Sequence, residues 1–237
     1  MTIGVPDQQM SDLVIEAPPL VTLPVSGTDK RFPVRRIYCI GRNYAAHTVE
    51  MGGDPDREPP FFFQKNPNSL DTSGAFPYPP KSSDVHHEVE MAVALKSGGT
   101  TIAIGDALDH VFGYAVAIDM TRRDLQGEAK KASRPWEIGK SFERSAPCGA
   151  LTAASETGHL DAGRIELKVN GDVRQEGDLG QMIWKVPEMI AHLSEYFELA
   201  PGDVILSGTP SGVGPVVKGD RMDAAIDRLG RISVEVV

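Results

Sequence analysis

The sequence has few cysteines and no long apolar run, and these absences exclude several classes of protein. Only two cysteines occur in 237 residues, so the chain has no disulfide scaffold, and we expect a reduced, cytoplasmic protein. No apolar stretch approaches the roughly 20 residues that cross a membrane. The first ten residues carry Asp7 without a basic flank or an apolar run. We therefore expect neither a signal peptide nor a membrane partner.

Positive charge is also scarce. The chain has 24 Lys and Arg against 33 Asp and Glu, a net charge of −9, and no basic cluster is longer than a pair. Nucleic-acid-binding proteins usually show a basic face, so we expect no nucleic-acid partner. Hydrophobic residues make up 41% of the chain and charged residues 24%, which is the ordinary balance of a globular protein.

The distribution of proline divides the chain into an N-terminal arm, residues 1–34, and a main domain, residues 35–237. Five prolines occur in the arm, and the apolar runs at 13–15 and 20–21 are candidates for short strands between them. Proline is tolerated at sheet edges, so this arm is expected to lie along an edge of the main domain.

Short strands dominate the expected structure of the main domain. Asn170-Gly171 is typical of a type I′ turn and predicts a hairpin over 168–173. Further strands are expected over four apolar or alternating segments, at 37–40, 61–63, 221–226 and 232–237.

Only two helices are expected. One spans 187–197, with Pro187 at its first position, and the other spans 121–131, with Thr121 as its N-cap. Many short strands with few short helices predict a β-rich α+β fold.

Two carboxylates lie on one face of an otherwise apolar strand, His87 to Leu95. Side chains alternate along a strand, so Glu88 and Glu90 share the face opposite the apolar residues Val89, Met91, Val93 and Leu95. Unpaired, these carboxylates repel one another and are costly to bury. A hard divalent cation such as Mg²⁺ or Mn²⁺ would relieve both costs. From this strand alone, a solvated face with Lys or Arg neighbours remains the commoner arrangement.

A second strand ends in another acid. Phe112, Tyr114, Val116 and Ile118 form one face, and small residues followed by Asp119 form the other. If the two strands are neighbours, Glu88, Glu90 and Asp119 would surround one divalent cation. The alternative is that Asp119 caps the helix that follows it.

Other polar side chains are candidates for catalysis or substrate binding. His47 and Glu50 share a face of a helical turn, so Glu50 could fix the tautomer of a histidine that removes a proton from water. Lys140 could stabilise an oxyanion, and Arg123 with Gln126 could hold a carboxylate. Each has a simpler alternative, which is exposure on the surface.

The glycine-rich loop 207–214 has neither the ending of a phosphate-binding loop nor dinucleotide-binding spacing. Nucleotide binding is therefore rejected, while its backbone amides and Thr209 could contact an anionic group.

Together these segments resemble the fumarylacetoacetate hydrolase family, in particular its short fumarylpyruvate and acylpyruvate hydrolases. Six segments match in family order, from about Arg35 nearly to Val237. They are Gly41–His47, His86–Glu90, Asp119–Asp124, Gly139–Phe142, Lys168–Gly171 and Gly208–Gly214. The segment Asp56–Phe63 resembles the fumarylpyruvate branch. One departure is Asn66, which lies between Lys65 and Pro67 where many relatives place proline directly after the lysine.

The resemblance implies a mixed β-sheet roll with few short helices, usually as a homodimer. It implies that Glu88, Glu90 and Asp119 bind one Mg²⁺ or Mn²⁺ ion, and that His47 and Glu50 activate water. Lys140 would be the third catalytic residue. The substrate would be bound by Arg123, Gln126, Thr209 and Lys65.

The implied activity is hydrolysis of a carbon–carbon bond in an acylpyruvate, with fumarylpyruvate cleaved to fumarate and pyruvate in gentisate-type aromatic degradation. The same scaffold also suits oxaloacetate decarboxylation or isomerisation of an oxo acid. A non-catalytic metal-binding protein would have no need of His47, Glu50 and Lys140.

Overall fold

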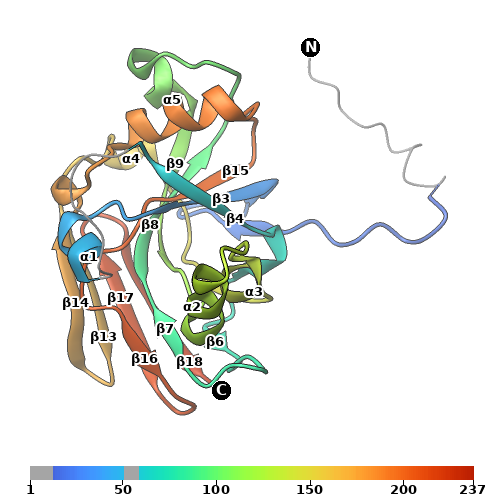
Figure 1. The fold of residues 1–237 in the computed structure, drawn as a ribbon. Coiled ribbons are helices and arrows are strands. Elements are labelled where there is room, and N and C mark those ends of the chain that lie inside the picture. The colour runs from blue at the N-terminus through green and yellow to red at the C-terminus, as the bar shows by residue number, and fades with distance from the viewer. Residues whose placement is uncertain (1–12, 51–58) are drawn as a thin grey trace.

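The computed structural model describes residues 13–50 and 59–237, in which β-strands predominate over helices (Figure 1). The β-rich α+β prediction is therefore confirmed. Two expectations concern residues outside the described ranges: the one for the first ten residues and the part of the branch-specific segment that covers residues 56–58. No helix among the described residues is long and apolar enough to span a membrane.

The larger of the two main sheets has six strands in the order β12-β9-β8-β15-β3-β4. β15 runs parallel to β3, and the other neighbouring pairs are antiparallel, so the sheet is mixed. Its strands are β3 (Arg36–Gly41), β4 (Phe61–Lys65), β8 (Val89–Leu95), β9 (Val111–Ile118), β12 (Thr152–Ala153) and β15 (Asp203–Leu206).

The second main sheet has five strands in the order β14-β13-β17-β18-β6. Asn170 (φ 53°) and Gly171 (φ 90°) both adopt positive φ between β13 and β14, which confirms the predicted hairpin. The strands are β6 (Ala75–Phe76), β13 (Arg164–Val169), β14 (Asp172–Asp178), β17 (Arg221–Ile226) and β18 (Gly230–Val236).

Three small sheets complete the strand structure. The order β10-β7-β16 joins β7 (Val85–His87), β10 (Thr121–Arg122) and β16 (Gly214–Val216). The pair β11-β5 joins β5 (Leu70–Asp71) and β11 (Ala146–Pro147), and the pair β1-β2 joins β1 (Thr22–Pro24) and β2 (Arg31–Pro33).

The main apolar core lies between the two large sheets and beneath α5 (Val186–Tyr196). Val89, Met91, Val93 and Leu95 point into it from β8, as the alternation predicts. A second core covers the other face of the six-stranded sheet, where Ala92 and Ala94 pack near Leu23 and Phe32 of the β1–β2 pair. Burying apolar side chains on both faces stabilises this sheet as the centre of the fold.

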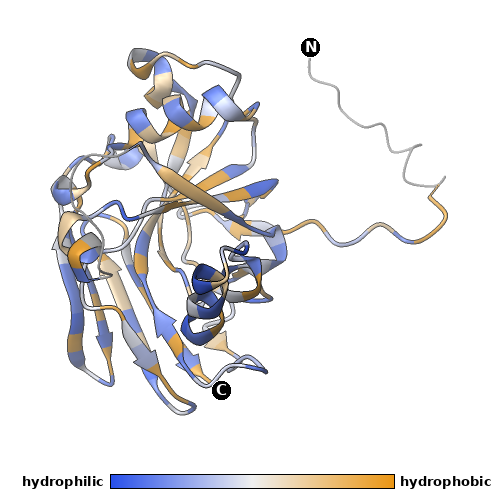
Figure 2. Ribbon diagram, viewed as in Figure 1, coloured by the Kyte–Doolittle hydropathy of each residue, from blue (hydrophilic) through white to orange (hydrophobic). Residues whose placement is uncertain are grey.

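The helices are short and lie outside the sheets (Figure 1). Figure 2 shows α5 with mixed hydropathy, whereas α2 is mostly hydrophilic. The apolar α5 residues Met189, Ile190 and Leu193 are buried. The helices are α1 (Ala45–Glu50), α2 (Arg123–Lys131), α3 (Glu137–Lys140), α4 (Ala154–Thr157) and α5, with 3₁₀ turns η2 (Pro67–Ser69), η3 (Ile104–His110) and η4 (Leu179–Gln181).

Several local predictions are wrong. Residues 13–15 are exposed and form no strand, and β1 begins only at Thr22. Thr121 does not cap α2. It lies in β10, where it pairs with His86 of β7, and its hydroxyl donates to Glu88. Phe112 packs with the second core, because a register shift between Ala94 and Leu95 turns it away from the face predicted for it.

Candidate active site

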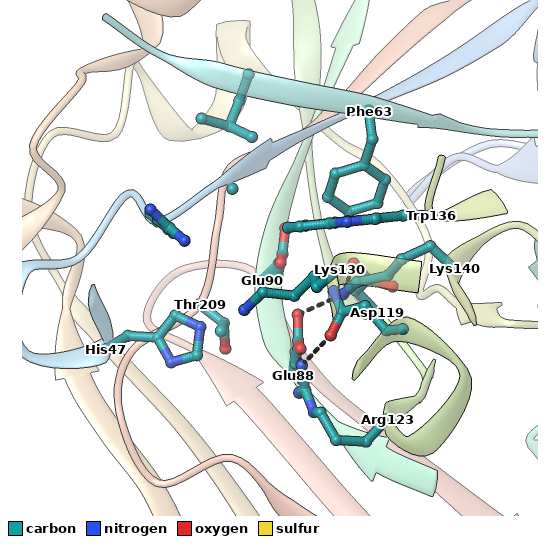
Figure 3. Close-up of a pocket in the computed structure, with 14 residues that line it drawn as sticks. His47, Phe63, Glu88, Glu90, Asp119, Arg123, Lys130, Trp136, Lys140 and Thr209 are labelled. Carbon is teal, nitrogen blue, oxygen red and sulfur yellow. Dashed lines mark hydrogen bonds and ion pairs between the residues drawn. The ribbon is translucent and has the colours of Figure 1, made fainter. Parts of the chain in front are cut away.

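Three buried carboxylates meet where β8 and β9 lie side by side. The predicted strand is interrupted at Glu88, which separates β7 from β8, while Glu90 lies within β8. Val89 pairs with Ile118, so Asp119 comes directly after the paired segment and its amide donates to the Glu88 carbonyl at 2.8 Å. One oxygen from each carboxylate lies within 4.8 Å of the others (Figure 3). The predicted juxtaposition of Glu88, Glu90 and Asp119 is thus present in the fold.

The three carboxylates fit a divalent cation. Glu90 accepts a hydrogen bond from the Gly208 amide at 2.8 Å, and no Lys or Arg among the described residues forms an ion pair with it. Burial, with the charges of Asp119 and Glu88, raises the pKa of Glu90 well above its usual value. A hard divalent cation would supply the missing positive charge, and carboxylate oxygens are the ligands that Mg²⁺ and Mn²⁺ prefer.

Two cationic side chains contact the same carboxylates from the helices that follow β9. Lys140, at the end of α3, donates to Glu88 Oε2 and Asp119 Oδ2, both at 2.8 Å. Arg123 donates to Glu88 Oε1 and, at 2.7 Å, to Gln126 Oε1. Burial alone would raise the pKa of Glu88, but the charges of Lys140 and Arg123 outweigh burial and hold that pKa well below its usual range. Lys140 is therefore a buried residue of the site rather than an exposed loop cation.

Lys65 lies on the far side of Asp119 and does not line the pocket. Its ammonium pairs with Asp119 Oδ1 at 2.8 Å and is fully buried. It also donates to Ser145 Oγ at 2.9 Å, to the Met120 and Ser145 carbonyls at 3.2 Å each, and to the Lys140 carbonyl. These partners occupy the ammonium completely. The structure therefore does not bring Lys65 to the position expected of a substrate-binding residue.

His47 and Glu50 form a hydrogen-bonded pair on α1. His47 Nδ1 lies 3.1 Å from Glu50 Oε2, and Glu50 also accepts from the Gly212 amide at 3.0 Å. A carboxylate only accepts, so Nδ1 carries the proton and Nε2 is left to accept one. At position 212 φ is +93° and an added Cβ would lie 2.0 Å from the Arg174 carbonyl oxygen. Glycine at this position therefore lets loop 207–214 pack directly against the backbone of Arg174, where the Gly212 amide donates to Glu50.

Thr209 is held by Gln175, a buried residue of β14 that the sequence pattern did not indicate. The Thr209 hydroxyl donates to the Val89 carbonyl and accepts from Gln175 Nε2, both at 2.8 Å. Gln175 Oε1 accepts from His87 Nδ1 at 2.9 Å and from the Val89 amide at 3.0 Å. The Thr209 proton is thus already used, and its oxygen would contact a ligand as an acceptor unless the bond to Val89 is exchanged.

These groups surround one pocket of about 470 Å³, including its opening to solvent. Eight of the ten predicted site residues line it, while Glu50 lies behind His47 and Lys65 behind Asp119. Six residues that were not predicted as site residues also line the pocket, and they are Ile40, Gly41, Arg42, Phe63, Lys130 and Trp136. For Lys130 a signal was present, because Arg123, Gln126 and Lys130 follow the i, i+3, i+7 spacing of one helix face.

Comparison with known proteins gives the family. The profile described as fumarylacetoacetate (FAA) hydrolase, C-terminal, matches residues 36–237. The chain belongs to the fumarylacetoacetate hydrolase family. Its β-rich fold with few helices is the fold of that family, as predicted.

Relatives within the fumarylacetoacetate hydrolase family differ in activity. The crystal structure of fumarylpyruvate hydrolase from Pseudomonas aeruginosa, in complex with Mn²⁺ and pyruvate, is 49% identical with a TM-score of 0.93, covering 95% of this chain and 99% of that one. A Ralstonia fumarylpyruvate hydrolase is 40% identical over 78% of this chain and 98% of its own length. The Escherichia coli oxaloacetate tautomerase YcgM is also 40% identical, over 83% of this chain and 90% of its own length. The chain is thus a fumarylacetoacetate hydrolase-family enzyme whose relatives include both hydrolases and tautomerases.

Proposed function

We propose that this enzyme hydrolyses an acylpyruvate, with fumarylpyruvate cleaved to fumarate and pyruvate in the cytoplasmic degradation of gentisate-type aromatic compounds. The observation that supports hydrolysis is the His47–Glu50 pair beside the carboxylate triad, because cleavage of this bond consumes water. Water adds its oxygen to the C4 carbonyl, the C3–C4 bond breaks, and C3 of the pyruvate enolate takes up a proton. The homodimer implied by the family remains part of this proposal.

In this proposal His47 is the general base. Glu50 accepts a hydrogen bond from His47 Nδ1 at 3.1 Å and another from the Gly212 amide at 3.0 Å. The imidazole is therefore kept in the tautomer whose Nε2 accepts a proton from water. His47 lines the same pocket as Glu88, Glu90 and Asp119. A water molecule between the imidazole and a bound acyl carbonyl would therefore be activated where the bond is broken.

The opposite side of the pocket suits a 2-oxo acid. Arg123 and Gln126 are hydrogen-bonded to each other and present a guanidinium and an amide to a substrate carboxylate. Lys140, held within 2.8 Å of two carboxylates, keeps its positive charge, since Asp119 and Glu88 outweigh burial and raise its pKa. That charge stabilises an oxyanion that develops on the substrate. A divalent cation held by Glu88, Glu90 and Asp119 would supply Lewis acidity that makes the pyruvate enolate a better leaving group.

Tautomerisation or decarboxylation of oxaloacetate is the second candidate. It is favoured by the 40% identity to the Escherichia coli tautomerase, and the same 2-oxo acid site would serve it. Decarboxylation needs no activated water. In a tautomerase His47 would instead move a proton at C3 of the substrate.

The deciding experiment follows the loss of enol ultraviolet absorbance and, separately, the release of pyruvate. Fumarylpyruvate, acetylpyruvate and oxaloacetate are compared with Mg²⁺ or Mn²⁺ and with excess chelator. We expect fast, chelator-sensitive loss of fumarylpyruvate with one pyruvate formed for each substrate consumed. Pyruvate from oxaloacetate but not from fumarylpyruvate would identify a decarboxylase. Enol loss from oxaloacetate without pyruvate, together with no pyruvate from fumarylpyruvate, would identify a tautomerase, and either result would overturn the hydrolase proposal.

A further inference from the structure

We propose that Lys130 binds a second, distal carboxylate of the substrate, which makes the enzyme selective for dianionic over monoanionic acylpyruvates. This inference rests on the proposed function and names its substrate class. Lys130 lies on α2 and lines the pocket together with Arg42 and Trp136.

The position of Lys130 follows from the helix that carries it. Arg123, Gln126 and Lys130 lie on the same face of α2, and all three line the pocket. The Lys130 ammonium is 5.8 Å from the centroid of the Trp136 ring, and this ring packs against Phe61 at 4.9 Å. Figure 3 shows Lys130 pointing into the pocket, towards the side that His47 and Thr209 form. Its charge is therefore directed at the space beyond the 2-oxo acid end.

Lys130 has no acidic partner of its own among the residues that the structure describes. No carboxylate in the described ranges forms an ion pair with its ammonium, in contrast to Lys140, which contacts two. Burial, followed by the charges of Arg42 and Arg123, lowers the pKa of Lys130. An anionic group beside Lys130 would relieve this repulsion, and a substrate carboxylate is an anion of the right kind.

The charge of the whole pocket favours a dianion. Apart from Arg42, its lining has three cations, Arg123, Lys130 and Lys140, and three carboxylates. With one divalent cation bound, these groups carry two net positive charges if all three carboxylates are ionised. A monoanionic substrate compensates one of these charges, and a dianion compensates both.

The direction of the substrate places its distal group near Lys130. With the 2-oxo acid at Arg123 and Gln126 and the attacked carbonyl beside His47, the acyl chain extends to the side of the pocket towards which Lys130 points. Fumarylpyruvate has a carboxylate at the end of that chain, whereas acetylpyruvate ends in a methyl group. The two substrates therefore differ in the group that Lys130 would contact.

The test compares kcat/KM for fumarylpyruvate and acetylpyruvate in Lys130→Gln, Lys130→Arg and Lys131→Gln. Lys131 is the adjacent lysine on α2, is exposed and does not line the pocket, so its variant is the matched control. In Lys130→Gln we expect kcat/KM for fumarylpyruvate to fall about 10- to 100-fold, as for loss of a charged hydrogen bond, mainly through KM. The value for acetylpyruvate should change less than about threefold, and Lys130→Arg should retain most of the selectivity.

Equal losses for both substrates in Lys130→Gln would overturn the inference, because Lys130 would then serve a group that the two substrates share. An unchanged preference for fumarylpyruvate would overturn it as well. Neither result bears on whether the wild-type enzyme is a hydrolase.

If wild type hydrolyses neither substrate, the proposed function fails and binding decides the role of Lys130. Calorimetry on the Mn²⁺-loaded protein would compare fumarate with crotonate, which has a methyl group in place of the second carboxylate. We expect wild type to prefer fumarate and Lys130→Gln to lose that preference. The same preference in both proteins would contradict the inference.

Discussion

Replacement of Lys65 with methionine separates two roles for this lysine, a substrate ligand or a buried cation that positions Asp119. The side chain is fully buried, pairs with Asp119 Oδ1 at 2.8 Å and donates to Ser145 Oγ at 2.9 Å. Methionine has a similar length but no charge and no donor. The substitution would leave Asp119 Oδ1 without its ion-pair partner and would remove the donor to Ser145 Oγ and to three backbone carbonyls.

The expected cost is large because one partner of a buried pair is removed. Such a loss typically destabilises a protein by about 3–5 kcal/mol. For a chain of this size, each kcal/mol lowers the melting temperature by about 2–4 °C, so we expect a fall of roughly 6–20 °C. Unfolding is measured by urea denaturation with a chelator present, because a bound cation would stabilise the native state by mass action.

Controls separate the ion pair from general damage to the core. Asp119→Asn should also be destabilising, and the double variant should lose less than the two single losses combined, because no uncompensated charge remains. The reasoning would be refuted if the free energy of unfolding of Lys65→Met lay within about 1 kcal/mol of the wild-type value, the range usual for exposed charges, while KM for the substrate rose. That result would restore the substrate-binding role predicted from the sequence.

Two further predictions concern the base and the triad. His47→Ala should lower kcat for fumarylpyruvate hydrolysis about 10²- to 10⁴-fold, as for loss of a general base, and should spare any decarboxylation of oxaloacetate; near-normal hydrolysis would exclude His47 as the base. Glu90→Gln should weaken Mn²⁺ binding, as measured by calorimetry. The loss should exceed the roughly 10- to 100-fold that is typical when a residue contacting a metal ligand, rather than the metal itself, is replaced. Because burial, Asp119 and Glu88 raise the Glu90 pKa above its ordinary 4.5, the folded, metal-free protein keeps a proton that the unfolded chain has lost. Its stability should therefore fall as pH rises from about 4.5 through the raised pKa, while Mn²⁺ affinity rises over the same window; a pH dependence unchanged in Glu90→Gln would contradict this assignment.

The chemistry of the site was largely visible in the sequence because local periodicity encodes which side chains share a face. Alternation separated Glu88 and Glu90 from Val89 and Met91, and the helical spacing of His47 and Glu50 placed them within hydrogen-bond reach. Asn170-Gly171 determined a hairpin through its own backbone preferences. These features depend on neighbours in the chain, so they need no knowledge of the rest of the fold.

Features that depend on distant partners were decided only in the tertiary structure. The pairing of Val89 with Ile118 brings Asp119 to Glu88, and the bulge near Leu95 turns Phe112 to the other face. Gln175 reaches Thr209 of the loop 207–214 from the five-stranded sheet, and a single glutamine in a hairpin has no pattern that signals such a contact.

Lys65 shows most clearly where the sequence stops being informative. Its residue type indicates a cation, and its place in β4 indicates a sheet, but neither tells whether the ammonium faces a ligand or a buried carboxylate. That choice depends on desolvation, which is set by the packing of Asp119, Met120 and Ser145 around the ammonium. The sequence by itself determined the kinds of groups in this site, and the tertiary structure decided which of them are exposed to the pocket, because burial is a property of the assembled fold.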